Sequence, residues 1–322
     1  MATLNLGNLT KYTDQLSGIL LKESVLVGST FDYISIQTGV KYADSINILT
    51  NSLTAAAGGC GTISPAGSTT LSQRSISVDA IKIEESVCVD EFEQYWIGQL
   101  AKEGSYNEMA PEVFNTLYLS NKVEKIGQLV EDIFWKASPS VRALIPGSGA
   151  GNLALASGIL NTLLYTSATS STVGATATGA LTLATALNVV DNMIAQIPND
   201  VLGAEDLTLF MSHANFRVLM NALRQGNYFT QYEGQKAHTW VLDNYTNTNV
   251  RVVATRGLNA TDIMVLTPSS NLYLGTDSFG EARNGDGFQF WYDIRDNITY
   301  FRAKLKVGAQ VAFPQYVVIK NS

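Results

Sequence analysis

Residues 45–73 read SINILTNSLTAAAGGCGTISPAGSTTLSQ and contain no Lys, Arg, Asp or Glu. Apolar residues occupy every second position near the start of this stretch, at Ile46 and Ile48, and again just beyond its end, at Ile76 and Val78. Such alternation is typical of β-strands, and the centre, rich in Gly and other small residues, is typical of a turn. The stretch therefore predicts a long antiparallel hairpin with a loose, uncharged tip.

The length of this hairpin indicates that it leaves the body of the protein. About fifteen residues per strand, at ~3.3 Å each, reach on the order of 45–50 Å, which exceeds what a compact domain of this size needs for itself. The alternation changes register near Ala80. We expect a bulge or a kink at that point.

A second long stretch, residues 143–190, also lacks charged residues. Surfaces that meet a partner are depleted of charge at their centres, because an ion that loses its water without gaining a counter-ion is strongly destabilising. Ser, Thr and Asn can instead exchange hydrogen bonds across an interface. Two uncharged stretches of this length favour contact with a partner surface over the alternative, which is a pair of long polar loops.

The overall composition excludes several classes of protein. The chain has 322 residues, with 21 Lys and Arg against 28 Asp and Glu, so its net charge of −7 disfavours a basic nucleic-acid-binding protein. With 46% hydrophobic residues it can build a core and is not a disordered protein. No apolar run reaches the ~20 residues of a membrane helix, and the first residues do not resemble a signal peptide. We expect no membrane contact and synthesis in the cytoplasm.

The rest of the pattern predicts a mixed α+β protein. Helical spacing of apolar residues predicts a short amphipathic arm and four longer helices, at residues 9–22, 90–102, 111–136, 180–196 and 213–225. Strands are expected at residues 207–211, 249–255, 262–267 and 271–275, followed by a final hairpin formed by FQFWYDI and ITYFRAKLKVGAQVAF. Ser212 is the expected N-cap of the helix that follows it.

The search for catalytic, metal or cofactor chemistry finds little. The only histidines, His213 and His238, fit a helix start and a strand edge better than a catalytic triad. The glycine run 147–151 lacks the spacing of a phosphate-binding loop and is interpreted as a turn between domains. Cys60 and Cys88 are expected to be free thiols, because two cysteines form neither a disulfide framework nor a zinc site. We expect no cofactor and no metal.

Charged residues concentrate in two places. Six carboxylates between residues 79 and 93 form an acidic run without the spacing of a calcium-binding loop, so a solvated edge, or one that faces a neighbouring subunit, is favoured over a cation site. Arg302, Lys304 and Lys306 share one face of the last predicted strand, where they can pair with acidic groups or with neighbours. Sequence-specific base readout is disfavoured at a pI near 4.9.

The order of these pieces resembles the major capsid proteins of tailed bacteriophages, which have the Hong Kong 97-like fold. The resemblance covers nearly the whole chain and depends on the ordered set rather than on any single motif. Its most specific parts are the segments LTLATALNVVDNMIAQIP, LTLFMSHANFRVLMNALRQG followed by NYF, NVRVVAT, and the closing FRAKLKVGAQVAFPQYVVI.

The resemblance implies a division of the chain into four parts. Residues 1–28 look like an N-terminal arm, 29–88 like an extension loop, 89–144 with 286–322 like a peripheral domain with a long spine helix, and 145–285 like an axial domain. It implies a structural, non-enzymatic subunit that self-assembles into hexamers and pentamers of an icosahedral head. The head would enclose double-stranded DNA without sequence-specific contacts.

The same resemblance implies which residues touch other copies of the chain. In the extension loop they are Asn51, Leu53, Ala57, Gly58 and Cys60, which would lie over a neighbouring subunit. In the axial domain Gln225, Tyr228, Phe229 and Tyr232 would face the capsomer axis. The virion is the expected location, with assembly in the host cytoplasm.

The sequence also departs from some relatives and leaves alternatives open. No large segment precedes the arm, so a separate scaffolding protein is expected, together with a portal and possible decoration proteins. Residues 45–73 contain no Lys, which disfavours the Lys–Asn cross-link that some relatives form there. The alternatives are an encapsulin-type bacterial nanocompartment with the same fold, and a cytoplasmic ligand-binding or hydrolytic protein that uses residues 145–285.

Overall fold

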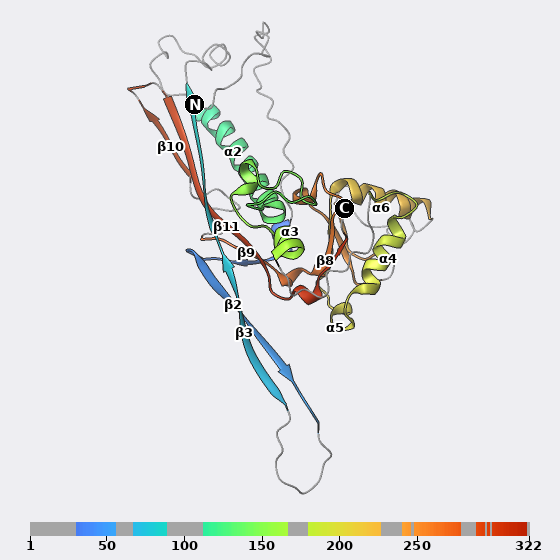
Figure 1. The fold of residues 1–322 in the computed structure, drawn as a ribbon. Helices are drawn as coiled ribbons and strands as arrows, with labels where there is room; N and C mark the ends of the chain where they lie inside the picture. Colours follow the sequence, from blue (N-terminus) through green and yellow to red (C-terminus); the bar gives the residue numbers. More distant parts are fainter. Residues whose placement is uncertain are drawn as a thin grey trace.

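A hairpin projects from a body of two sheets and several helices in the computed structural model (Figure 1). The mixed α+β class that the sequence predicts is confirmed. The expected arm helix (9–22) and the helix at 90–102 lie outside the described residues. The structure describes residues 30–55, 67–88, 112–166, 180–226, 240–245, 248–277, 288–293, 295–296 and 298–320.

The hairpin consists of strands β2 (Ala43–Ser52) and β3 (Ser68–Ser77). They pair antiparallel over ten residues, and their free end points away from the rest of the chain (Figure 1). This confirms the hairpin that the alternation of Ile46, Ile48 and Ile76 predicts. The paired strands span about 33 Å, at ~3.3 Å per residue, which is shorter than the 45–50 Å expected.

The difference arises because the second arm of the expected hairpin is divided at Val78. Beyond that residue the chain continues as β4 (Asp79–Cys88), which leaves β2 and pairs over ten residues with β11 (Ile298–Val311) in the body. The break falls two residues before Ala80, where the sequence predicts a kink. The chain therefore changes sheets at this point instead of bulging within one.

The first sheet is built on β11, the longest strand of the structure at 14 residues. Residues 298–307 of β11 pair with β4, and from Gly308 onward its partner is β9. Helix α2 (Glu112–Lys136) confirms the helix expected at residues 111–136. It packs against this sheet. The remaining strands of this sheet are β1 (Ser35–Gln37), β9 (Leu272–Gly275) and β10 (Phe288–Asp293).

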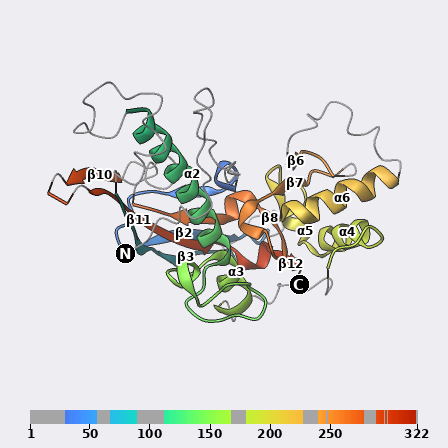
Figure 2. The same ribbon diagram turned by 90° about the horizontal axis from the view of Figure 1, so that it is seen from above.

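The second sheet has the order β12, β8, β5, β7, β6, and only the β5–β7 pair is parallel. Its strands are β5 (Leu207–Met211), β6 (Val241–Leu242), β7 (Arg251–Ala254), β8 (Met264–Pro268) and β12 (Val318–Lys320). Helices α4 (Ala186–Gln196) and α6 (His213–Gln225) lie at this end of the molecule (Figure 2). Two short helices, α3 (Ile159–Asn161) and α5 (Asn199–Leu202), complete the described α-helices. Ser212 caps α6 as predicted, because its hydroxyl accepts a hydrogen bond from Asn215 N at 3.2 Å.

Side chains of the second sheet alternate between two hydrophobic clusters. Leu209 and Met211 on β5 join the cluster that contains α4 and α6, whereas Phe210 joins the cluster around α2. There the Phe210 ring lies 5.3 Å from that of Trp135, which is fully buried. The core stripe predicted for the long helix is confirmed at Ile126, Val130, Ile133 and Phe134, all of which are buried.

A pair of glycines provides the space in which the hairpin meets the body. Gly308 on β11 lies directly opposite Gly275 on β9. A Cβ on Gly308 would lie 2.0 Å from the carbonyl oxygen of Ser77, and one on Gly275 would lie 2.9 Å from the Ile76 side chain. Only glycine fits at Gly308 without a backbone shift, so this pair fixes where the hairpin leaves the sheet.

We expect Gly308→Ala to lower the free energy of unfolding of the unassembled chain by roughly 1–3 kcal/mol, because the added methyl group must displace backbone at Ser77. Urea denaturation measures this change. Gly127→Ala is the matched control, since no atom lies within 4 Å of its Cβ position in α2 and alanine favours the helix by ~1 kcal/mol. Equal stability of the Gly308→Ala variant and the wild type would contradict the steric argument.

Candidate functional site: the projecting hairpin and the root of the N-terminal segment

The two faces of the hairpin differ in what they contact. Ile46 and Ile76, near its base, are buried and form a small cluster with Ala312 of the body. Ile48 packs at the edge of the same cluster, beside Tyr273 and Phe313. This face therefore holds the hairpin against the body.

The opposite face carries leucines that nothing in the described chain covers. Leu49 and Leu71 occupy directly opposite positions on β2 and β3, and their side chains are 60% and 68% exposed. Leu53, just past the end of β2, is 93% exposed. We call these three residues the hairpin leucines. Exposed leucines at paired positions form an apolar contact surface on an element that reaches away from the body.

The charged residues nearest to the uncharged stretch lie at the hairpin base and have partners there. Asp44 accepts hydrogen bonds from Gln37 Nε2 at 2.5 Å and from Ser45 N at 2.8 Å. Arg74 donates to the carbonyl oxygen of Val311 at 3.1 Å. From Ser45 to Gln73 the hairpin is neutral, so a partner can cover it without stripping water from an ion.

The structure describes three of the nine candidate contact residues. Gln225, the last residue of α6, is exposed. Asn51 is exposed on β2, opposite Thr69, and Leu53 is one of the hairpin leucines. The other six lie outside the described residues: Ala57, Gly58, Cys60, Tyr228, Phe229 and Tyr232. The sequence argument missed Leu49 and Leu71. The register of the two strands is what identifies these leucines. Because Ile46 pairs with Arg74, Leu49 pairs with Leu71 on the face opposite to Ile46.

The first described residues are fastened to α2 by a buried polar network. The Thr30 hydroxyl donates a hydrogen bond to the carboxylate of Glu131 and accepts one from Trp135 Nε1 at 3.1 Å. All three side chains are fully buried. Burial raises the pKa of the Glu131 carboxyl and the charge of Asp132 acts in the same direction, while the hydrogen bond from Thr30 opposes the rise. The network holds Thr30, the first described residue, against α2.

This raised pKa gives a pH dependence with a defined sign. The folded chain holds the Glu131 proton more tightly than the unfolded chain. The contribution of this group to folding stability is therefore fully present below its ordinary pKa of 4.5 and is lost as pH rises through the folded-state pKa. We expect the melting temperature of Glu131→Gln, relative to that of the wild type, to increase from about pH 4 to about pH 7. Thermal melts across this range measure the difference. The exposed Glu205→Gln is the control, and melting curves of Glu131→Gln that track the wild type at every pH would contradict the assignment.

The groups considered for catalysis have structural partners. His213 Nδ1 lies 3.2 Å from Asn259 Oδ1, its ring meets that of Trp240 edge-on at 4.8 Å, and burial lowers its pKa. His238 lies outside the described residues. These contacts support the interpretation of His213 as a residue of the helix start.

The glycine run 147–151 forms a tight turn. Gly147, Gly149 and Gly151 all have positive φ angles, and a Cβ on Gly149 would lie 2.5 Å from Val141 N. The Ser148 hydroxyl accepts a hydrogen bond from Arg142 N at 2.7 Å. The run therefore packs against the residues that follow α2, which supports its interpretation as a structural turn.

The acidic run forms ion pairs where the structure describes it. Glu84 pairs with Arg302 and Lys82, each at 2.7 Å, and Glu85 pairs with Lys122 of α2. Within the described ranges no three His, Cys, Asp or Glu residues are arranged to hold a metal ion. In that same part of the chain, no helix has both the length and the apolar character needed to cross a membrane. Cys88 is a free, partly buried thiol, and Cys60 lies outside the description.

Comparison with solved structures identifies the fold. The structure matches a chain of the capsid of Myoviridae Phage XM1 over 100% of both chains, with a TM-score of 0.56 and 13% sequence identity. It matches a chain of the capsid of an empty GTA particle over 94% of each chain, with a TM-score of 0.55 and 11% identity. A chain of the satellite phage P4 procapsid matches with a TM-score of 0.53 and 13% identity, over 91% of this chain and 86% of that one.

These matches are structural only, since no family model and no curated protein matches the sequence. The chain has the fold found in phage and GTA capsids. The Hong Kong 97-like fold that the order of segments predicts is thereby confirmed over nearly the full length of the chain.

Proposed function

We propose that this chain is the major capsid protein of a tailed phage, a structural subunit without enzymatic activity. Copies of it assemble into hexamers and pentamers of an icosahedral head that encloses double-stranded DNA. The observation that carries the proposal is the end-to-end match to the XM1 capsid chain, with every part of one chain covered by the other. A ligand-binding protein or hydrolase that shared only the α/β part would not match over the hairpin as well.

In this subunit, residues 1–28 are the N-terminal arm, 29–88 the extension loop, and 145–285 the axial domain. Residues 89–144 and 286–322 form the peripheral domain, with α2 as its spine. The pairing of β4 with β11 supports one refinement: the second half of the extension loop, from Asp79 onward, is built into the peripheral sheet. Among the described strands, β2 and β3 are then the part of the extension loop that reaches beyond the body.

In the assembled shell, the projecting hairpin brings the hairpin leucines into contact with a neighbouring subunit. Burying an exposed leucine side chain contributes roughly 1.5–3 kcal/mol, so Leu49, Leu53 and Leu71 supply a substantial apolar contact per copy. Asn51, Ala57, Gly58 and Cys60 belong to the same uncharged stretch and lie over the neighbouring subunit with it. The residues proposed to face the capsomer axis are Gln225, Tyr228, Phe229 and Tyr232.

The assembly and filling of such a head require further proteins. The shell must be given its size and a passage for DNA, which we assign to a separate scaffolding protein and a portal, with decoration proteins as optional additions. The protein resides in the virion and assembles in the host cytoplasm without a membrane. DNA is held by enclosure rather than by sequence-specific contacts.

We expect the double variant Leu49→Asp, Leu71→Asp to abolish shell formation while the chain stays folded, because two carboxylates would have to lose their water in the contact. Electron microscopy and light scattering measure assembly, and circular dichroism reports the fold. Leu49→Met with Leu71→Met is the matched control, since it keeps the apolar volume. Normal shells from the Asp variant would contradict the role of this face.

The same experiment tests the function itself. Wild-type chain that remains a small monomer under all assembly conditions would contradict a capsid protein. The contents of particles isolated from their natural source distinguish a phage head from an encapsulin-type compartment. A phage head contains DNA and carries a tail, whereas an encapsulin-type compartment contains protein cargo.

A shell of acidic subunits should bind DNA weakly. Each copy carries a net charge of −7, and affinity for duplex DNA depends on cations that neutralise its phosphates. We expect purified shells titrated with duplex DNA at low salt to show weak binding that disappears as salt is added. Tight binding that persists at high salt would contradict the prediction that the shell binds DNA weakly.

A further inference from the structure

The face of the first sheet that points away from α2 carries a line of cations. Along β11, Phe301, Ala303 and Leu305 are buried, whereas the residues between them lie on the other face. This confirms the shared face expected for Arg302, Lys304 and Lys306. Together with two lysines from adjoining segments they form what we call the basic strip: Lys41, Lys82, Arg302, Lys304 and Lys306.

Two carboxylates lie within the basic strip, and each is already shared by two cations. Glu84 pairs with Lys82 and with Arg302, each at 2.7 Å, and hydrogen bonds from these two residues lower its pKa. Asp277 pairs with Lys41 at 2.6 Å and with Lys306 at 3.4 Å. Four of the five cations thus share two carboxylates, in a chain whose overall charge is negative.

Lys304 is the cation that this sharing leaves out. Its Cα partner across the β4–β11 pair is Lys82, and like charges at directly opposite positions of a sheet are destabilising. Lys304 is exposed, and among the described residues its ammonium group has no ion-pair partner. The arrangement is unfavourable in the isolated chain and becomes favourable once an anion is added.

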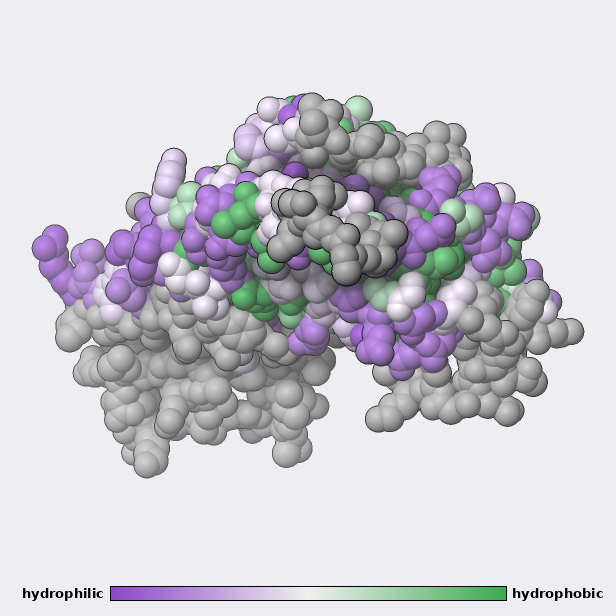
Figure 3. Space-filling model, turned by 90° about the horizontal axis from the view of Figure 1, so that it is seen from below, coloured by the Kyte–Doolittle hydropathy of each residue, from purple (hydrophilic) through white to green (hydrophobic). Residues whose placement is uncertain are grey.

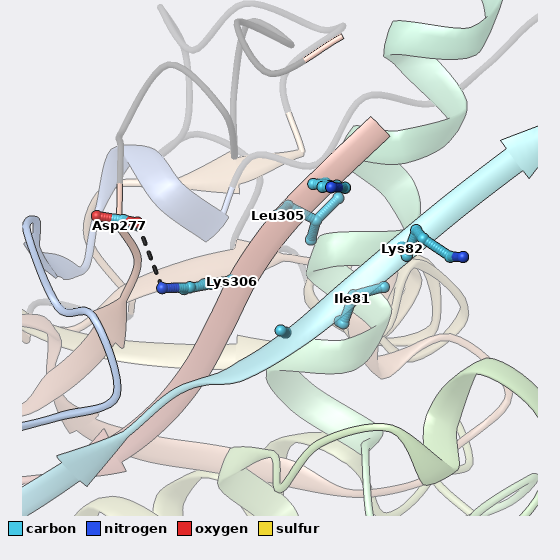
Figure 4. A pocket seen from close by; sticks show the side chains of 7 residues that line it. Ile81, Lys82, Asp277, Leu305 and Lys306 are labelled. Carbon is cyan, nitrogen blue, oxygen red and sulfur yellow. Dashed lines mark ion pairs between the residues drawn. The ribbon is translucent and has the colours of Figure 1, made fainter. Parts of the chain in front are cut away.

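Three cations of the strip, Lys82, Lys304 and Lys306, line a hollow. A cavity of about 320 Å³ opens above the paired strands, lined by Ala80, Ile81, Lys82, Asp277, Lys304, Leu305 and Lys306. Figure 4 shows Lys306 directed toward Asp277 while Lys82 points away from it. Single acidic side chains can enter this space beside the Lys304 ammonium.

The interleaved carboxylates distinguish between possible anions. A continuous row of phosphates would pass close to Glu84 and Asp277 as well as to the cations, and these two carboxylates would repel it. Separate carboxylates of another copy can instead occupy the positions between them. Such carboxylates are exposed on each copy, for example at Asp200 and Glu205. The hydropathy view in Figure 3 shows that hydrophilic residues make up much of one described face.

We propose that the basic strip is a docking site for carboxylate side chains of a second copy of this chain, with Lys304 as its central cation. The inference rests on the proposed function, because it assigns one of the contacts through which capsid subunits meet. It places an ionic contact on the body of the subunit, separate from the apolar contact of the hairpin leucines.

Carbodiimide cross-linking of assembled shells tests the site, since it joins a lysine to a carboxylate only where the two are in contact. Shells are formed from a mixture of ¹⁴N and ¹⁵N chains, treated, digested and analysed by mass spectrometry. We expect mixed-isotope peptides that join Lys304 to an Asp or Glu, and dimer bands on a denaturing gel. Their yield should fall when salt is raised from about 0.1 M to about 1 M before assembly is complete, as the Debye length falls from ~10 to ~3 Å.

Lys304→Arg is the matched variant. It keeps the charge and should assemble normally, but arginine does not react, so the mixed-isotope peptides at this position should disappear. Lys304→Glu should reduce the yield of shells at low salt. The proposal is overturned if well-formed shells give no intercopy link at Lys304, if Lys304 links only to Glu84 or Asp277 of its own chain, or if Lys304→Glu weakens DNA retention and leaves assembly unchanged. A failure of the proposed function is a different result, in which no shells form at all.

Discussion

The contact of Ser77 with Gly308 is the constraint on which the shape of this protein depends. At that point β3 ends in the hairpin, β4 begins in the body sheet, and β11 exchanges β4 for β9 as its partner. All three changes need backbone to lie against backbone, which the absence of side chains at Gly275 and Gly308 permits. The crossing turns one continuous extended segment into both a core strand and a projecting arm.

A second fixed point lies where Glu131 and Trp135 of α2 hold Thr30. Burying a carboxyl group is costly, and the hydrogen bond from Thr30 offsets part of that cost. The base of the hairpin and the first described residue are therefore both fastened to the body.

The sequence predicts the elements well because their signals are local. The hairpin follows from the alternation around an uncharged stretch, α2 from its apolar stripe, and the capped helix α6 from Ser212. The division at Val78 could not be predicted, since it depends on Gly275 and Gly308, which are distant in sequence. The pairing of Thr30 with Glu131 spans 101 positions and leaves no local signal. The candidate contacts remain predictions, and the exposed pair Leu49 and Leu71 could be recognised only once the strand register was known.

The narrow attachment of the hairpin has a mechanical consequence. A rigid arm of ten paired residues, at ~3.3 Å each, acts as a lever about 33 Å long, so a rotation of ~10° at its base moves its end by about 6 Å. Small adjustments where Ser77 passes Gly308 would thus be magnified at the far end without any change in the body. In the proposed head, one polypeptide would in this way fit the different curvatures of five-fold and six-fold rings through a small rotation at the base of the hairpin.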